Sequence, residues 1–245
     1  MRRVLALLIA GLALGGCGLS ARAGGAGPQL VAAVRSDAPP FGWRDGAAEP
    51  LAGFDVDLAR AIVRQLHGED ATLRFIPPAA GAEADLVMGR PPGAGTTRAY
   101  LEQPLALLVK QGSPVGGLAD LDGRQLALVS DVPQAAPQVA GVRYVPALFS
   151  TYPLALAAVG QGRAEALAGE LPVLRALAAL DPNRRIVASG YGRIAYAIAA
   201  PARLLPSVDA ALGRLMADPN FWPPLLHRWG LDSRRGGGGT TRQAP

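Results

Sequence analysis

The sequence has few side chains whose types and spacing suit enzyme chemistry. Its two histidines, His67 and His227, lie far apart and show no metal-ligand spacing. Asp209 and Asp218 have no acidic partner at a spacing useful for glycoside hydrolysis. The sequence also contains no G-x-S-x-G, H-E-x-x-H or P-loop motif. These observations predict a protein that is not an enzyme and that needs neither a cofactor nor a metal.

Phosphate and nucleic acid are also poor matches for this sequence. Residues 89–95 are rich in glycine, but the prolines among them remove backbone donors that a phosphate-binding loop needs. Arg2, Arg3 and Arg22 lie near the N-terminus, and without them the 24 basic side chains fall to 21 against 19 acidic ones, a net charge of +2. The remaining arginines are scattered along the chain. We therefore expect no nucleic-acid partner.

The N-terminal residues predict export from the cytoplasm. Two arginines precede an apolar run over residues 4–14, which is too short to span a bilayer. Residues 14–17, Leu-Gly-Gly-Cys, have the pattern of a lipobox, and Cys17 is the only cysteine. Residues 21–23, Ala-Arg-Ala, form a competing cleavage site. We expect residues 1–23 to be a leader and the protein to be periplasmic or extracytoplasmic, with a lipid anchor if Cys17 is used.

The clearest helix pattern in the sequence covers residues 53–66. Its apolar side chains recur every four residues and form one face of an amphipathic helix. Asp55 and Asp57 fall in its first turn, where carboxylates can cap free N–H groups, so we interpret them as caps. Apolar patterns also predict helices over residues 154–167, with a break at residues 160–162, and over residues 171–180 and 208–216. We expect residues 233–245, with four consecutive glycines, to be a disordered tail.

The string GFDVDLARAIVRQL over residues 53–66 also resembles the signature of family 3 bacterial solute-binding proteins. These are the extracytoplasmic receptors of ABC importers for polar amino acids. The resemblance covers residues 30–231 and is carried by further segments: the strand at residues 30–34, the Asp-Ala-Pro-Pro-Phe turn at 37–41, the strand at 84–89, the crossover from 99 to 110, the LADLDGRQLAL segment at 118–128, the GRAEA segment at 162–166 and the aromatic-rich end at 221–231.

The resemblance implies an α/β protein with the two-lobed, periplasmic-binding-protein-like type II fold. Two crossover segments would form the hinge, near residues 99–104 and 190–195. Lobe I would then comprise residues 28–99 and 195–232, and lobe II residues 104–190. Since too little chain lies between Phe75 and Asp85 for the second helix of lobe I, we expect that lobe to be shortened.

The resemblance also implies a ligand site in the cleft between the lobes. An amino acid ligand needs a guanidinium for its carboxylate, an acid for its ammonium group and an aromatic wall. The candidates for ligand binding are Phe41, Trp43, Arg90, Arg98, Tyr100 and Glu170.

The sequence departs from the family pattern at most of these places. Ala38 stands where the family usually has a stacking aromatic residue, and the loop that carries the carboxylate-binding arginine is missing. Arg98 lies at the crossover and Arg90 lies closer to the missing loop, although both also fit solvated surface arginines. Asp131 replaces part of a Gly-Thr or Gly-Ser pair. Glu170 keeps the acidic position, although it also fits a surface carboxylate beside a helix start.

These departures predict that standard L-amino acids bind weakly or not at all. Phe41 equally fits a core position. The primary functional hypothesis is a monomeric receptor that delivers a small polar solute to an ABC permease. The alternative is an accessory protein of a periplasmic quinoprotein dehydrogenase, because residues 88–100 resemble a stretch of such proteins. A cyclohexadienyl dehydratase shares the implied fold, but no acid and base pair supports it.

Overall fold

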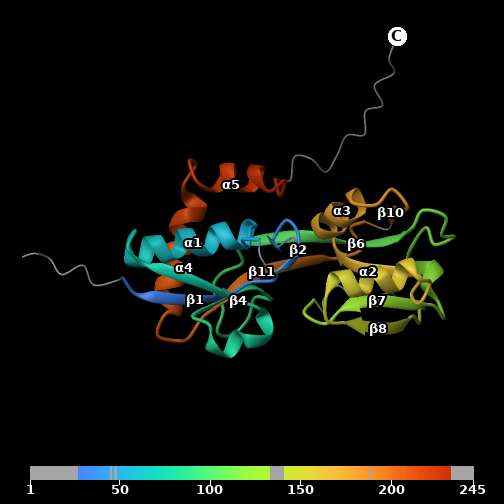
Figure 1. Ribbon diagram of the computed structural model, residues 1–245, viewed down its shortest axis with the longest axis horizontal. Helices are drawn as coiled ribbons and strands as arrows, with labels where there is room; N and C mark the ends of the chain where they lie inside the picture. Colours follow the sequence, from blue (N-terminus) through green and yellow to red (C-terminus); the bar gives the residue numbers. More distant parts are fainter. Residues whose placement is uncertain (1–26, 45, 47–48, 133–140, 188, 233–245) are drawn as a thin grey trace, which may run out of the picture.

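The computed structural model describes residues 27–44, 46, 49–132, 141–187 and 189–232 (Figure 1). The predicted leader, Cys17, both cleavage sites and the predicted tail lie outside the described residues. Within the described ranges, no helix is both long and apolar enough to cross a membrane.

One half of the molecule is built on a four-stranded section of sheet in the order β4-β1-β5-β11. Strand β1 (Gln29–Ala33) pairs in parallel with β4 (Thr72–Ile76) and β5 (Leu86–Arg90). Strand β11 (Arg193–Ala199) runs antiparallel to β5. Three helices complete this half, α1 (Phe54–His67), α4 (Leu205–Ala217) and α5 (Trp222–Arg228). A small hairpin, β2 (Asp37–Ala38) and β3 (Gly42–Trp43), follows β1.

The other half is built on the strands β6 (Leu101–Lys110), β7 (Gln125–Val129), β8 (Val145–Phe149), β9 (Ala166–Glu170) and β10 (Arg184–Val187). Strand β6 pairs with β9 and β10, and β9 continues through β7 to β8. Helices α2 (Tyr152–Gly160) and α3 (Leu171–Ala179) lie in this half, and a short 3-10 turn, η2 (Leu118–Leu121), precedes β7. The α/β two-lobed fold predicted from the sequence is confirmed.

Two long strands connect the halves (Figure 1). The start of β6 pairs with the start of β11, from Leu101 opposite Tyr196 to Pro104 opposite Arg193. The rest of β6 belongs to the second half, and the rest of β11 pairs with β5 in the first half. The chain thus crosses between the sheets in two adjacent strands, which is an arrangement that permits hinge bending. The lobe boundaries stated above stay a prediction.

Helix α1 begins at a glycine that its surroundings require. Gly53 has a φ of 145°, and an added Cβ would collide with the carbonyl group of Phe41. The carbonyl groups of Pro40 and Phe41 accept hydrogen bonds from the first N–H groups of the helix. The capping interpretation of Asp55 is therefore wrong, since its carboxylate contacts Tyr100 instead.

Asp57, the other acid in that turn, also contacts a different element. Its Oδ2 accepts a hydrogen bond from the indole N–H of Trp229 at 3.0 Å and pairs with Arg228 at 3.3 Å. This carboxylate therefore ties α1 to the C-terminal end of α5, and its capping interpretation is wrong as well.

Two further expectations about helices have different outcomes in the structure. The helix predicted over residues 154–167 ends at Gly160, and Leu167 lies in β9, whose residues are all buried between β6 and β7. In lobe I, the segment before β5 forms only the short 3-10 helix η1 (Pro78–Glu83), as the shortened lobe requires. The remaining predicted helices correspond to α1, α3 and α4.

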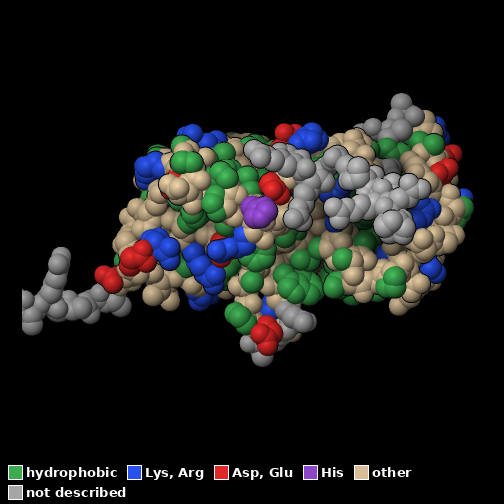
Figure 2. Space-filling view, turned by 90° about the horizontal axis from the view of Figure 1, so that it is seen from above, with side chains coloured by type: hydrophobic (Ala, Val, Ile, Leu, Met, Phe, Trp, Pro, Cys, Tyr) green, Lys and Arg blue, Asp and Glu red, His purple; other side chains and the backbone are tan. Residues whose placement is uncertain are grey.

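The charged side chains on one face of the molecule are of both signs (Figure 2). On the face shown in Figure 2, Lys and Arg side chains lie on both halves and are interspersed with hydrophobic and acidic side chains. A phosphate-tracking surface would need these cations in one stripe.

Candidate functional site

Glu170 is the centre of a charged cluster between the two halves. It ends β9, directly before α3, and its side chain is completely buried. Its Oε1 accepts hydrogen bonds from the guanidinium of Arg35 at 2.7 Å and from the hydroxyl group of Tyr196 at 2.7 Å. The hydroxyl group of Tyr152 donates to Oε2. The alternative interpretation of Glu170 as a surface carboxylate is therefore wrong.

Arg35 brings the cation of this cluster from the opposite half. It follows β1, 135 positions before Glu170, and forms the ion pair through Nη2. Its guanidinium carbon lies 6.0 Å from the ring centroid of Phe41 and 5.9 Å from that of Tyr152. Both distances suit cation–π contacts. The second nitrogen, Nη1, is buried and has no hydrogen-bond partner among the described residues.

The cluster favours an ionised pair with protonated tyrosines. Burial raises the pKa of Glu170, but the charge of Arg35 and the donated hydrogen bonds outweigh it and hold that pKa below its usual range. Burial acts to lower the pKa of Arg35, but the negative charge of Glu170 acts to raise it. The pKa of Arg35 is therefore above its usual value. The pKa values of Tyr152 and Tyr196 are raised by burial and by the nearby carboxylate. Both phenols therefore act as hydrogen-bond donors.

A second buried carboxylate lies beside this cluster. Asp55, in the first turn of α1, accepts a hydrogen bond from the hydroxyl group of Tyr100 at 2.8 Å. That hydroxyl group accepts a hydrogen bond from the N–H of Gly89 at 3.0 Å. Burial, the largest effect, raises the pKa of Asp55 to about 6. The ring of Tyr100 stacks on Tyr196, with centroids 6.3 Å apart, and so joins the two carboxylate sites.

A void of about 20 Å³ separates parts of the cluster. Its wall includes Arg35, Gly89, Arg90, Asp131, Glu170 and Tyr196. A space of this size holds a water molecule but not an organic solute. In the arrangement of the described residues, an organic solute therefore does not fit in this void.

The structure brings some of the predicted site residues together and leaves others apart. Phe41 is buried against the ring of Tyr196, with centroids 5.1 Å apart, and Tyr100 and Glu170 are parts of the cluster just described. Arg90, at the end of β5, is exposed and lies on the wall of the void. Trp43 is partly exposed on β3, at the edge of the hairpin.

Arg98 is engaged elsewhere. Its Nε and Nη2 bind the carboxylate of Asp209 on α4, at 3.0 and 2.6 Å, and its backbone N–H adds a bond to the same carboxylate at 2.8 Å. This bidentate pair lies at the lobe I surface, so the structure does not bring Arg98 to the cluster.

Sequence reasoning missed Arg35, Tyr152 and Tyr196 as site residues. A charged residue directly after an apolar strand, as Arg35 is, is the one local signal that was present. Tyr152 lies in the first turn of α2, and its N–H donates to Asp37 in the opposite half at 2.8 Å. Tyr196 lies within β11. Neither tyrosine carries a local motif.

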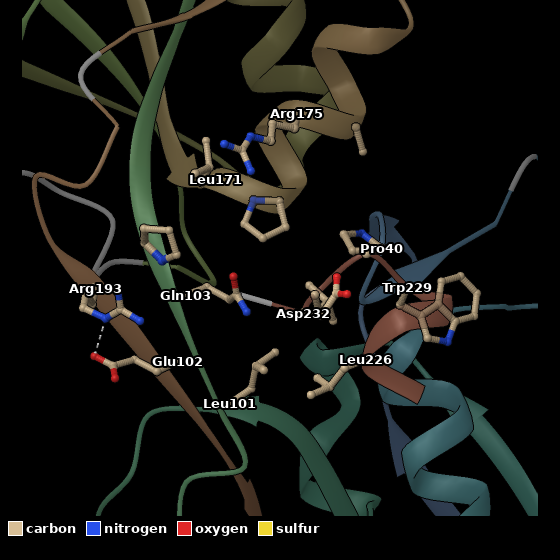
Figure 3. Close-up of a pocket in the computed structure, with 15 residues that line it drawn as sticks. Pro40, Leu101, Glu102, Gln103, Leu171, Arg175, Arg193, Leu226, Trp229 and Asp232 are labelled. Carbon is tan, nitrogen blue, oxygen red and sulfur yellow. Dashed lines mark ion pairs between the residues drawn. The ribbon is translucent and has the colours of Figure 1, made fainter. Parts of the chain in front are cut away.

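A second and larger cavity of the described residues is different in kind. A groove of about 620 Å³ lies across the hinge, where β6, the start of α3 and the end of α5 meet (Figure 3). Arg193 and Glu102 on its wall pair with each other at 2.8 Å, and both side chains are more than half exposed. Its other wall residues include Gln103, Arg175 and Trp229.

The comparisons with known proteins agree with this architecture. No family model matches the chain. A glutamine-binding protein of Geobacillus stearothermophilus is 23% identical over 192 residues, which cover 69% of this chain and 71% of that protein. A glutamine-binding protein of an ABC transporter from Bacillus subtilis is 21% identical over 226 residues, covering 82% and 81%.

Solved structures match over most of their length. An ancestral arginine-binding protein bound to glutamine has a TM-score of 0.71 at 24% identity, covering 83% of this chain and 98% of that one. A periplasmic binding protein of an arginine transport system from Legionella pneumophila also has a TM-score of 0.71, at 19% identity, covering 82% and 99%. The chain has the fold of these binding proteins. The resemblance to family 3 solute-binding proteins is thereby confirmed.

Proposed function

We propose that this protein is an extracytoplasmic receptor that delivers a small polar solute to an ABC importer. The observation that carries this proposal is the buried charged cluster, which takes Arg35 from one half and Glu170 from the other. In open α/β sheets, ligand sites form beyond the carboxyl ends of strands, where Arg35 follows β1 and Glu170 ends β9. The two relatives named above are glutamine-binding proteins, and the one from Bacillus subtilis belongs to an ABC transporter, which favours this function over the accessory role and over an enzyme.

Solute binding is expected to involve movement of the two halves about β6 and β11. The lobe boundaries near residues 99–104 and 190–195 belong to this proposal, because they place the bending in the two crossing strands. Small-angle scattering is expected to show a more compact particle with solute than without it. Curves that stay unchanged with a solute that binds would contradict the hinge.

Arg90 is the predicted site residue that best fits a solute contact. Its guanidinium is exposed at the wall of the void and forms no hydrogen bond or ion pair with the described residues. Phe41, Trp43 and Tyr100 then support the site from the same half, Phe41 and Tyr100 through the core and Trp43 at the hairpin edge.

A thermal-shift screen of small polar solutes tests the receptor function directly. A solute at about 100 times its dissociation constant adds ~2.7 kcal/mol to the free energy of unfolding. We expect at least one solute to raise the melting temperature, and Arg90→Ala to reduce that shift. The matched control is Arg98→Ala, since Arg98 is held by Asp209 away from the cluster. A reduction of equal size in both variants would remove Arg90 from the site.

The location of the protein and its membrane partner depend on Cys17 and on the importer. We propose that Cys17 carries lipid and that the monomeric receptor works with a membrane permease. The native protein should then partition into detergent, whereas Cys17→Ser should be released or should keep its leader. Equal solubility of both forms, each cleaved after Ala23, would contradict the anchor.

A further inference from the structure

The acidic site between the two halves is already occupied by a cation of the chain itself. The carboxylate of Glu170 is buried, and both of its oxygens accept hydrogen bonds from Arg35, Tyr152 and Tyr196. The same guanidinium lies beside the rings of Phe41 and Tyr152. A carboxylate flanked by aromatic rings is the arrangement that binds organic cations. Here the chain supplies that cation.

A positively charged solute group would have to displace Arg35 from this position. The displaced guanidinium would lose the 2.7 Å ion pair with Glu170 and would remain close to the incoming charge. Like charges that are not screened by water repel strongly. The site therefore selects against ammonium and guanidinium groups.

The other nitrogen of Arg35 points to the kind of group that the site does accept. Nη1 is buried and lacks a partner among the described residues, while Arg35 borders the small void. Buried donors are nearly always hydrogen-bonded, so an unpaired one needs an explanation. An anionic oxygen acceptor on a solute would supply the missing hydrogen bond.

Two other charged side chains border the same void. Arg90 adds a second cation, and Asp131 adds a carboxylate. Both are exposed, so solvent screens their charges more strongly than that of the buried Nη1. The strongest unmet interaction therefore belongs to Arg35.

We propose that Arg35 is a resident cation that sets the specificity of the receptor. It fills the acidic site at Glu170 and presents Nη1 to the oxygen of a small organic carboxylate that has no ammonium group. The second half of this inference, the identity of the solute, rests on the proposed receptor function. Its first half, the filled acidic site, can be tested without any natural solute.

The first experiment compares solutes that differ only in the ammonium group. Glutarate is paired with glutamate, and succinate with aspartate, in calorimetric titrations of the full mature protein. We expect binding of at least one dicarboxylate and, because Arg35 repels an ammonium group, at least about tenfold weaker binding of the matching amino acid. An amino acid that binds as tightly as its partner would overturn the proposal.

The second experiment empties the acidic site. Arg35→Ala leaves Glu170 between the tyrosines, and we expect it to bind methylguanidinium at least about tenfold more tightly than the wild type does. The double variant Arg35→Ala with Glu170→Gln is the matched control, because it has the same space without the charge. Equal binding of methylguanidinium by wild type, single variant and double variant would overturn the resident-cation inference.

A second variant covers the case in which Arg35→Ala does not fold. Arg35→Lys keeps a cation for Glu170 but has no second planar nitrogen. We expect it to fold and to bind the preferred carboxylate about tenfold more weakly. Unchanged carboxylate affinity in Arg35→Lys would contradict the role of Nη1.

The two experiments separate the inference from the proposed function. If no solute in the whole screen binds the wild type, the receptor function and the carboxylate assignment both fail. Binding of methylguanidinium by Arg35→Ala would then still support the filled acidic site. If the wild type binds a zwitterionic amino acid tightly, the receptor function stands and the specificity assignment fails.

Discussion

The cluster around Glu170 and the groove across the hinge differ in almost every respect that matters for binding. The groove has a volume of about 620 Å³, whereas the void in the cluster has about 20 Å³. In the groove, Arg193 and Glu102 are solvated and paired with each other. In the cluster, Glu170 is buried, and one nitrogen of Arg35 has no hydrogen-bond partner in the part of the chain that the structure describes. Cavity volume alone would therefore identify the groove as the binding site, although its charged side chains are already solvated and paired with each other.

The difference arises from where the side chains originate. The cluster joins ends of strands from both halves, so its contacts depend on the two halves being together. The groove is lined by the hinge strand β6, by the start of α3 and by the end of α5 (Figure 3). Buried charges are sensitive to the loss of a partner, whereas exposed pairs are not.

The largest effect is expected from Arg35→Ala. It leaves the carboxylate of Glu170 buried without its cation, which costs about 3–5 kcal/mol of stability in such pairs. Urea unfolding should show this loss as a lower midpoint. Adding Glu170→Gln should recover much of it, because the unpaired charge is then gone. If the double variant is no more stable than the single one, the charge of Glu170 is not the cause.

The next effect concerns Asp55 and pH. The pKa of Asp55 in the folded protein is about 6, above its ordinary value of 3.8, so the folded state binds the proton more tightly than the unfolded state. Its contribution to stability is fully present below pH ~4 and is lost as the pH rises through ~6, an upper limit of about 3 kcal/mol.

The pH dependence can be assigned to this residue with Asp55→Asn. The variant keeps an oxygen that accepts the Tyr100 hydrogen bond but does not titrate. Melting temperatures between pH 5 and 7.5 should therefore favour the wild type increasingly toward pH 5. The lowered pKa of Glu170 acts in the opposite direction only at more acidic pH. Parallel curves for the two proteins would contradict the assignment.

A smaller effect is expected when one hydroxyl donor to Glu170 is removed. Tyr196→Phe keeps the ring that packs on Phe41 but loses the 2.7 Å hydrogen bond to Oε1. Hydrogen bonds to charged groups contribute about 1.5–3 kcal/mol, so the midpoint of urea unfolding should fall accordingly. Tyr152→Phe removes the donor to Oε2 and should have a similar effect. A loss below ~0.5 kcal/mol in both variants would show that Arg35 alone stabilises the carboxylate.

The smallest effect is expected in the groove. Arg193→Ala removes an ion pair whose partners are both more than half exposed, and such pairs contribute about 0–1 kcal/mol. Unfolding midpoints should barely change, and the affinity for any solute of the cluster should stay the same. A large loss of solute affinity in Arg193→Ala would move the binding site to the groove.

The fold could be predicted further than the site. Helix α1 follows from its fourfold apolar spacing, and the shortened lobe I follows from the length of chain before β5. The helix predicted over residues 154–167 does not resume after its break at residues 160–162, because alanine-rich sequence fits both the end of α2 and the buried strand β9. Local pattern could not separate them, since only the neighbouring strands β6 and β7 determine that the second part is a strand.

The site depended on contacts over long sequence distances. The acidic position of Glu170 was visible in the sequence, but its burial was not, because Arg35 lies 135 positions away. In the sequence, Arg98 is a candidate substitute for the missing arginine, although its position matches the crossover and not the arginine loop. Its actual partner, Asp209, lies 111 positions away on α4. Charged residues are assigned by their partners in space, and local spacing says little about those partners.

The short η1 segment has a consequence for the order in which the molecule opens locally. Side chains of β1 alternate between the sheet's two faces, and Val31 and Ala33 point toward the small cluster of Ile76, Ala84 and Val87 beside η1. The opposite face is covered by the long helix α1, which packs on β4 and β5 and also contacts α4. Regions with little packed apolar surface open at a lower free energy than the rest of a protein. Backbone amides of β4 should therefore exchange with deuterium before those of β6 and β9, and a protease should reach this edge of lobe I more readily than the strands β6 and β9.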